Sequence, residues 1–216
     1  MKKHIRNIFV ILTAISLIML TACGGSTTDA SESENQTAET TEETTAQAAE
    51  KIGIHHAEME IEGYGTVSLE LDGDTAPVTV QNFMDLANEG FYDGLTFHRI
   101  IDGFMIQGGD PNGNGTGGSD TNIVGEFALN GYENNISHTK GVISMARAQD
   151  YNSGSSQFFI MVADGDYLDG QYAAFGHVTD GQDIVDKIAA DAEPLDDNGT
   201  IAAEDQPVIS SVKIID

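Results

Sequence analysis

The chain has 216 residues, enough for one domain of ordinary size with further segments at its ends. It carries 35 acidic side chains against nine Lys and Arg, a net charge of −26. Nucleic-acid binding needs clustered basic side chains that neutralise phosphates, so the composition argues against a nucleic-acid partner. The single cysteine, Cys23, excludes an intramolecular disulfide.

The first 22 residues have the pattern of an export signal. Lys2, Lys3 and Arg6 precede a mostly apolar run over residues 8–20, which is short for a membrane span. The run ends at Leu20-Thr21-Ala22-Cys23, which resembles the signal of a bacterial lipoprotein. The resemblance implies cleavage after residue 22 and lipidation of Cys23. A diacylglyceryl group there would anchor the protein at the cell membrane, on its extracytoplasmic face. The alternative is an ordinary cleaved signal with an incidental cysteine.

Residues 23–51 are predicted to form a disordered tether after the lipidated cysteine. The stretch is rich in Ser, Thr, Ala and Glu and has no aromatic side chain, so it cannot bury a core. The folded domain is therefore expected to span residues 52–216.

This domain is predicted to contain many short strands and two helices. Apolar alternation on both sides of Gly63-Tyr64-Gly65 indicates a β-hairpin, and Asp74-Thr75-Ala76-Pro77 indicates a capped helix start. Val80, Phe83, Leu86 and Ala87 have helical spacing, and Gly90 ends that helix. Further strands are expected over residues 141–145, 157–162, 174–178 and 208–215. Ile184, Val185 and Ile188 mark the second helix.

The chemistry is concentrated in Phe97–Gly109. Two strands joined at Asp102-Gly103 would place alternate side chains on opposite faces, so Arg99, Phe104, Met105 and Gln107 could meet on one surface. The run Ser155–Met161 offers similar chemistry, with the Gln157 amide beside aromatic side chains.

These two stretches resemble the signature segments of the cyclophilins, a family of peptidyl-prolyl isomerases. Further blocks agree in order: Asn114–Gly118, Ser144–Ala148, Gly154–Phe159, Leu168–Gly170 and Phe175-Gly176. The resemblance implies a mainly β domain, a closed eight-stranded antiparallel barrel capped by two α-helices. It also implies prolyl cis–trans isomerisation in unfolded or partly folded proteins, with no cofactor or metal. A monomer is expected.

The resemblance also assigns roles to eleven residues. Arg99 matches the catalytic arginine, which donates a hydrogen bond to the nitrogen of the twisted prolyl amide. Gln107, assigned to catalysis, and Gln157, assigned to substrate binding, match the amides that hydrogen-bond the substrate backbone and orient the arginine. The remaining matches are substrate-binding: Phe104, Met105 and Phe159 in the pocket floor, Leu168 at its rim, and Ala146 and Arg147 along the peptide. Tyr167 and Tyr172 are also expected to bind substrate, although they stand where well-known members have Trp and His, and Arg147 replaces a common Asn. Arg147 raises the hypothesis of a preference for acidic residues beside the proline.

Other functions receive less support from the residues. A non-catalytic module that binds proline segments, as a chaperone or adaptor, remains the main alternative, and a structural envelope lipoprotein is a third. Gly113–Gly118 matches a dinucleotide pattern without a following helix, and a calcium loop beginning at Asp110 lacks its final Glu. His98 is expected to be a structural, hydrogen-bonded histidine. Ser144, Ser155 and Ser156 lack the local setting of an activated nucleophile.

Overall fold

The computed structural model describes residues 49–216. The predicted signal, Cys23 and nearly all of the predicted tether lie outside the described residues. Within residues 49–216, no helix is both long and apolar enough to cross a membrane.

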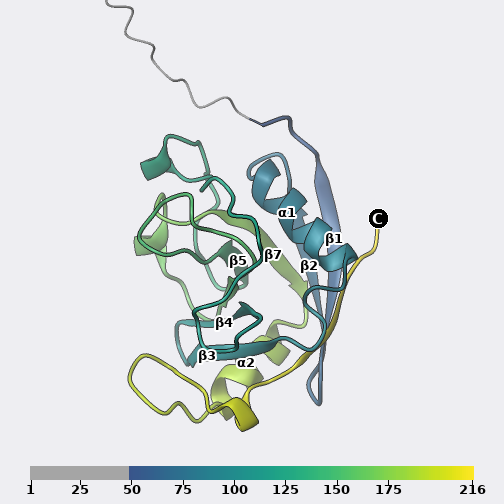
Figure 1. Ribbon diagram of the computed structural model, residues 1–216, viewed down its shortest axis with the longest axis vertical. Coiled ribbons are helices and arrows are strands. Elements are labelled where there is room, and N and C mark those ends of the chain that lie inside the picture. The colour runs from purple at the N-terminus through teal and green to yellow at the C-terminus, as the bar shows by residue number, and fades with distance from the viewer. Residues whose placement is uncertain (1–48) are drawn as a thin grey trace, which may run out of the picture. The chain divides into compact units, whose positions relative to one another are not determined.

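The described chain forms eight strands, two α-helices and three short 3₁₀ turns (Figure 1). The strands and helices are β1 (Ile54–Ile61), β2 (Gly65–Asp72), α1 (Pro77–Asn88), β3 (Thr96–Ile101), β4 (Met105–Asp110), β5 (Val142–Met145), β6 (Phe158–Met161), β7 (Ala174–Asp180), α2 (Gln182–Asp191) and β8 (Ile209–Ile214). Every strand and helix expected from the sequence is present.

All the strand pairs are antiparallel, in the order β3-β4-β6-β5-β7-β2-β1-β8. The sheet curls until its edges meet, where Thr96 and Val208 form an isolated bridge. The Ile209 N–H also donates to the Leu95 carbonyl at 2.8 Å. The predicted eight-stranded barrel is therefore confirmed, although a short bridge closes it in place of a continuous ladder. Helices α1 and α2 lie at opposite ends of it (Figure 1).

Strand alternation divides the apolar side chains between two clusters. Ile106, Phe158 and Ile160 belong to the main core inside the barrel, whereas their neighbours Met105 and Phe159 belong to a smaller cluster on the other face. Leu168 and Tyr172 pack on that smaller cluster from the segment before β7. The barrel thus presents an apolar surface on its outer side, framed by β4, β6 and this segment.

The first helix is capped differently from the sequence prediction. Pro77 does begin α1, but its N-cap residue is Ala76 and no side chain of the preceding turn makes the capping bond. Glu126 provides the cap from a distant segment. Its carboxylate accepts the Val78 N–H at 3.0 Å, the Thr79 N–H at 2.8 Å and the Thr79 hydroxyl at 2.7 Å. Glu126 is 2% exposed and Thr79 is 0% exposed, so the two bonds from Thr79 are buried.

Removing this cap is expected to destabilise the domain. The Glu126→Ala variant should lose about 2–3 kcal/mol of unfolding free energy, because buried backbone donors are left without an acceptor. Urea unfolding measures the difference, and Glu62→Ala, at an exposed position, is the matched control. Equal stabilities for the two variants would contradict the capping role of Glu126.

Candidate active site

The Arg99 guanidinium is held from two sides. Arg99 and Gln107 are cross-strand partners in β3 and β4, and Nη1 donates to the Gln107 Oε1 at 3.2 Å. On the other side, Nε donates to the Asn198 carbonyl at 2.8 Å. Met105 Sδ lies 3.7 Å from Nη1 and is a weak additional acceptor. The guanidinium therefore has a fixed plane.

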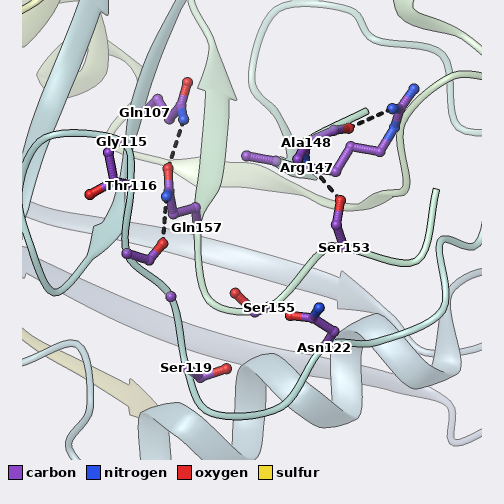
Figure 2. A pocket seen from close by; sticks show the side chains of 13 residues that line it. Gln107, Gly115, Thr116, Ser119, Asn122, Arg147, Ala148, Ser153, Ser155 and Gln157 are labelled. Carbon is purple, nitrogen blue, oxygen red and sulfur yellow. Dashed lines mark hydrogen bonds between the residues drawn. The ribbon is translucent and has the colours of Figure 1, made fainter. Parts of the chain in front are cut away.

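Gln107 is itself fixed by a chain of amides. Its Nε2 donates to the Gln157 Oε1 at 2.9 Å, and the Gln157 Nε2 donates to the Gly117 carbonyl at 2.7 Å. Figure 2 shows these two bonds running from the strand to the glycine-rich loop. Because each amide uses its NH₂ as a donor, each carbonyl oxygen is left to accept, which fixes the orientation of both amides.

A cavity of about 180 Å³ opens beside Arg99 on the outer face of the barrel. Phe104, Met105 and Phe159 give it apolar walls, and the side chains of Arg99, Gln107 and Arg147 contribute polar groups. It is lined by nine residues: Arg99, Phe104, Met105, Gln107, Ala146, Arg147, Phe159, Leu168 and Tyr172. All nine are among the eleven site residues expected from the sequence. Of the other two, Gln157 is hydrogen-bonded to Gln107, and Tyr167 is 61% exposed with its ring centroid 6.1 Å from that of Phe104.

A second cavity of about 340 Å³ adjoins the first and is more polar. The two cavities share Gln107, Ala146 and Arg147, so one extended segment could contact both. Figure 2 shows this cavity between the glycine-rich loop and the segment after β5. Its polar lining includes Thr116, Ser119, Asn122, Ser153 and Ser155, none of which the sequence analysis assigned to a site. The glycine-rich composition of residues 113–118 is the sequence feature that could have indicated this second cavity.

Arg147 is folded against its neighbours. Its guanidinium carbon lies 4.8–5.1 Å from the ring centroids of Phe127, Tyr151 and Tyr172, within the range of cation–π attraction. Nε donates to the Gln171 carbonyl at 3.0 Å, and Nη1 to the Ala148 carbonyl at 2.9 Å. Arg147 thereby joins the segment after β5 to the segment before β7, and it lines both cavities.

Burial affects the charge state of Arg99 only slightly. Desolvation lowers the pKa of the guanidinium, while Tyr172 and Asp196 act to raise it. An arginine remains protonated through any such shift near neutrality. The site therefore contains a permanent cation beside an apolar cavity.

His98 differs from the sequence expectation. It is 4% exposed, yet neither ring nitrogen has a hydrogen-bond partner within the described part of the chain. The prediction of a hydrogen-bonded histidine is therefore wrong. Burial lowers the pKa of His98, which favours the neutral ring and reduces the cost of this arrangement.

The glycine-rich loop is organised by Asp110. Asp110 Oδ1 accepts the Asn112 N–H at 2.8 Å, and Oδ2 accepts the N–H groups of Asn114 and Gly115 at 3.0 and 2.6 Å. These bonds outweigh desolvation and lower the pKa of Asp110. The loop residues that resemble a calcium motif therefore form a turn around an anionic side chain.

A Ser-His-Asp arrangement exists in the structure although the residues around Ser144 do not have the local pattern of an activated nucleophile. The His138 ring lies between Asp169 and Ser144, with Nδ1 2.9 Å from Asp169 Oδ1 and Nε2 3.0 Å from Ser144 Oγ. Ser144, however, is 0% exposed and lies in β5, so its hydroxyl cannot reach an external carbonyl. His138 also stacks on Phe159, with ring centroids 6.0 Å apart. The group supports the cavity floor and is not a nucleophilic site.

The fold and the site together define a cyclophilin-like domain. Residues 56–215 match the family described as cyclophilin type peptidyl-prolyl cis-trans isomerase/CLD. A curated relative from Rhizopus delemar, peptidyl-prolyl cis-trans isomerase-like 1, is 47% identical over 125 residues, which cover 57% of this chain and 74% of the relative. A peptidyl-prolyl cis-trans isomerase from Helicobacter pylori is 47% identical over 126 residues, covering 57% and 74%.

A solved structure agrees with these relatives. The crystal structure of a cyclophilin type peptidyl-prolyl cis-trans isomerase from Cryptosporidium parvum superposes with a TM-score of 0.66 at 28% identity. It covers 76% of this chain and 98% of the Cryptosporidium chain. The chain belongs to the cyclophilin-type peptidyl-prolyl cis–trans isomerases.

The two buried histidines predict how stability depends on pH. Burial lowers the pKa of His138 and of His98, with Asp169 partly opposing the shift of His138. The unfolded chain has an ordinary histidine pKa of about 6.5, so it binds protons below that pH more readily than the folded chain. Their stabilising effect is thus complete above about pH 6.5 and is lost as the pH falls through the lower folded-state pKa.

We expect the unfolding free energy to fall between pH 7.5 and pH 5.5, by at most about 1.4 kcal/mol per histidine for each pH unit. His138→Gln should show a shallower decrease than the wild type, and His177→Gln, at an exposed position, is the matched control. Urea unfolding at a series of pH values provides the measurement. Parallel curves for His138→Gln and the wild type would contradict this assignment.

Proposed function

We propose that the chain isomerises X-Pro bonds in unfolded or partly folded proteins outside the cytoplasm. Arg99 assists by donating a hydrogen bond to the nitrogen of the twisted prolyl amide. A lipid on Cys23 holds the protein at the outer face of the cell membrane. Membership of the isomerase family supports the reaction, and the observation that carries the mechanism is the oriented Arg99 guanidinium beside an apolar cavity.

The reaction requires rotation and no bond cleavage. Peptide-bond rotation has a barrier of about 18–20 kcal/mol, and spontaneous prolyl isomerisation takes tens of seconds or longer. At the twisted geometry the amide loses resonance, and its nitrogen regains a lone pair that can accept a hydrogen bond. A group that binds this state better than either planar isomer accelerates the rotation. No metal, nucleophile or proton transfer is needed for this step.

Arg99 has the geometry that this role requires. Nε is engaged by Asn198, and Nη1 by Gln107 and more weakly by Met105, so the Nη2 protons remain available to a ligand in the cavity. A charge-assisted hydrogen bond is stronger than a neutral one, and partial removal from water strengthens it further. Acceleration of about 10⁴-fold corresponds to about 5–6 kcal/mol. One such bond, formed mainly in the twisted state, together with orientation of the substrate is sufficient.

The apolar walls provide the binding energy. Phe104, Met105 and Phe159 offer a surface for the pyrrolidine ring, and the cavity volume suits one small apolar group. Holding the ring fixed while the preceding residue rotates restricts motion to the required torsion. Gln107 keeps the guanidinium aligned with that torsion through the bonds described above.

The role of Arg99 is testable by substitution in the full chain. Arg99→Ala should lower kcat/KM for a proline peptide by one to two orders of magnitude, because a preorganised donor is lost. Arg99→Lys should recover little, because all the donors of a lysine lie on one nitrogen and cannot reproduce the planar spread with which Nε meets Asn198 and Nη1 meets Gln107. A coupled-protease or NMR exchange assay measures the rate.

Peptide binding by Arg99→Ala should be nearly unchanged in the same experiment. Near wild-type catalysis in Arg99→Ala would contradict the mechanism. Wild-type rates no faster than the spontaneous reaction, with proline peptides still bound, would favour the non-catalytic chaperone or adaptor.

The setting is proposed from the N-terminal sequence. The basic residues, the apolar run and Cys23 at its end have the order of a lipoprotein signal, and one lipid group with two acyl chains suffices for durable anchoring. The polar residues that follow would let the domain reach chains emerging near the membrane.

Lipidation of Cys23 makes a separate prediction. Expressed in a bacterium, the wild-type protein should be found in the membrane fraction, with intact mass increased by a diacylglyceryl group after loss of residues 1–22. Cys23→Ser should be recovered without the lipid and should not partition into a detergent phase. An unmodified wild-type Cys23 in the mature protein would contradict the anchor while leaving the isomerase mechanism intact.

A further inference from the structure

The segment between α2 and β8 forms one side of the Arg99 site. Its Asn198 carbonyl accepts the Arg99 Nε proton at 2.8 Å. This segment is not one of the resemblance blocks, and none of its residues was expected to take part in the site. It contacts the guanidinium through main-chain atoms, whose position depends on what holds the turn.

Asp196 holds that turn through its carboxylate. Oδ1 accepts the N–H groups of Asn198 at 3.0 Å and Thr200 at 3.1 Å, and Oδ2 accepts the Thr200 hydroxyl at 2.9 Å. The bonds from Thr200 are the largest cause of a lowered pKa at Asp196, so the carboxylate is charged at neutral pH. Every side-chain bond of Asp196 in the structure is directed to the four residues after it.

The turn is docked on the edge strand β3 by main-chain bonds. The Ile100 N–H donates to the Gly199 carbonyl at 2.8 Å, and the Ile201 N–H donates to the His98 carbonyl at 3.0 Å. Gly199 has φ +85°, and a Cβ there would lie 2.5 Å from the Ile100 carbonyl oxygen, so the close approach requires glycine. The bonds flank Arg99 on both sides and direct the Asn198 carbonyl toward its side chain.

The turn has little apolar support of its own. Leu195 is 70% exposed, and residues 196–198 are all exposed. Its conformation therefore depends mainly on hydrogen bonds, of which the Asp196 side chain accepts three. Loss of that side chain should loosen the turn while leaving the barrel core intact.

We propose that Asp196 is a positioning residue for Arg99, acting through the turn that places the Asn198 carbonyl against the guanidinium. Gln107 fixes Nη1 from β4, and Asp196 fixes Nε indirectly from the opposite side. Two acceptors on different atoms define the plane of the guanidinium, whereas one would let it pivot. The proposal rests on the catalytic role of Arg99 proposed above.

The test compares Asp196→Ala with Asp197→Ala in the full chain. Asp197 is also exposed, and its removal changes the charge by the same amount next to the same turn. We expect Asp196→Ala to lower kcat about 3- to 10-fold with KM changed less than twofold, because misorientation of a catalytic group acts mainly on the transition state. Asp197→Ala should stay within twofold of wild type in both constants. Asp196→Asn retains one acceptor oxygen and should recover most of the loss.

An NMR signature separates positioning from a general structural effect. In Asp196→Ala, the chemical shift of the Arg99 Nε–H proton should move toward that of a solvent-exposed arginine, and this proton should exchange faster with water. Both quantities should be unchanged in Asp197→Ala. If Asp196→Ala has the kcat of the wild type and an unchanged Arg99 Nε–H resonance while Arg99→Ala is inactive, the role proposed for Asp196 is wrong. The mechanism proposed for Arg99 is not affected by that result. Wild-type activity in Arg99→Ala would instead overturn the proposed mechanism on which it rests.

Discussion

The alternation of side chains along β3, β4 and β6 is the constraint on which the site depends. Met105 pairs with Met161, and Gln107 pairs with Phe159, so these four side chains share the outer face of the barrel. The pair between them, Ile106 and Ile160, points into the core. The Arg99–Gln107 pair brings the cation onto the same face. A shift of one residue in register would exchange the two faces, burying the amide and exposing the core. The barrel core therefore fixes the site as firmly as it fixes the fold.

The site achieves its chemistry with few polar groups. The Arg99 guanidinium and the Gln107 amide border the cavity next to the apolar side chains of Phe104, Met105 and Phe159. The other ionisable groups nearby are engaged elsewhere. His98 is buried, and His138 is held between Asp169 and Ser144. Such groups could suggest acid–base or nucleophilic chemistry, but their burial makes them part of the support beneath the site.

Local sequence patterns predict what depends on nearby residues. Two-residue alternation located the strands, and three- and four-residue spacing located both helices. The signature blocks contain eight of the nine residues that line the cavity beside Arg99, all but Tyr172. Local patterns do not predict interactions between residues that are far apart in the chain. Glu126 caps a helix 47 residues earlier, His138 meets Asp169 across 31 residues, and Asn198 meets Arg99 across 99. Nothing in the residues around these positions marks a partner that only the folded chain brings near.

Arg147 illustrates how the folded chain changes the meaning of a residue. From the sequence, a basic side chain in a very acidic protein suggested attraction of acidic residues beside the proline. In the structure, three aromatic rings surround its guanidinium and two carbonyls accept from it, which leaves less of its charge to a ligand. Its clearest effect is mechanical, because it ties together two segments that border the apolar cavity.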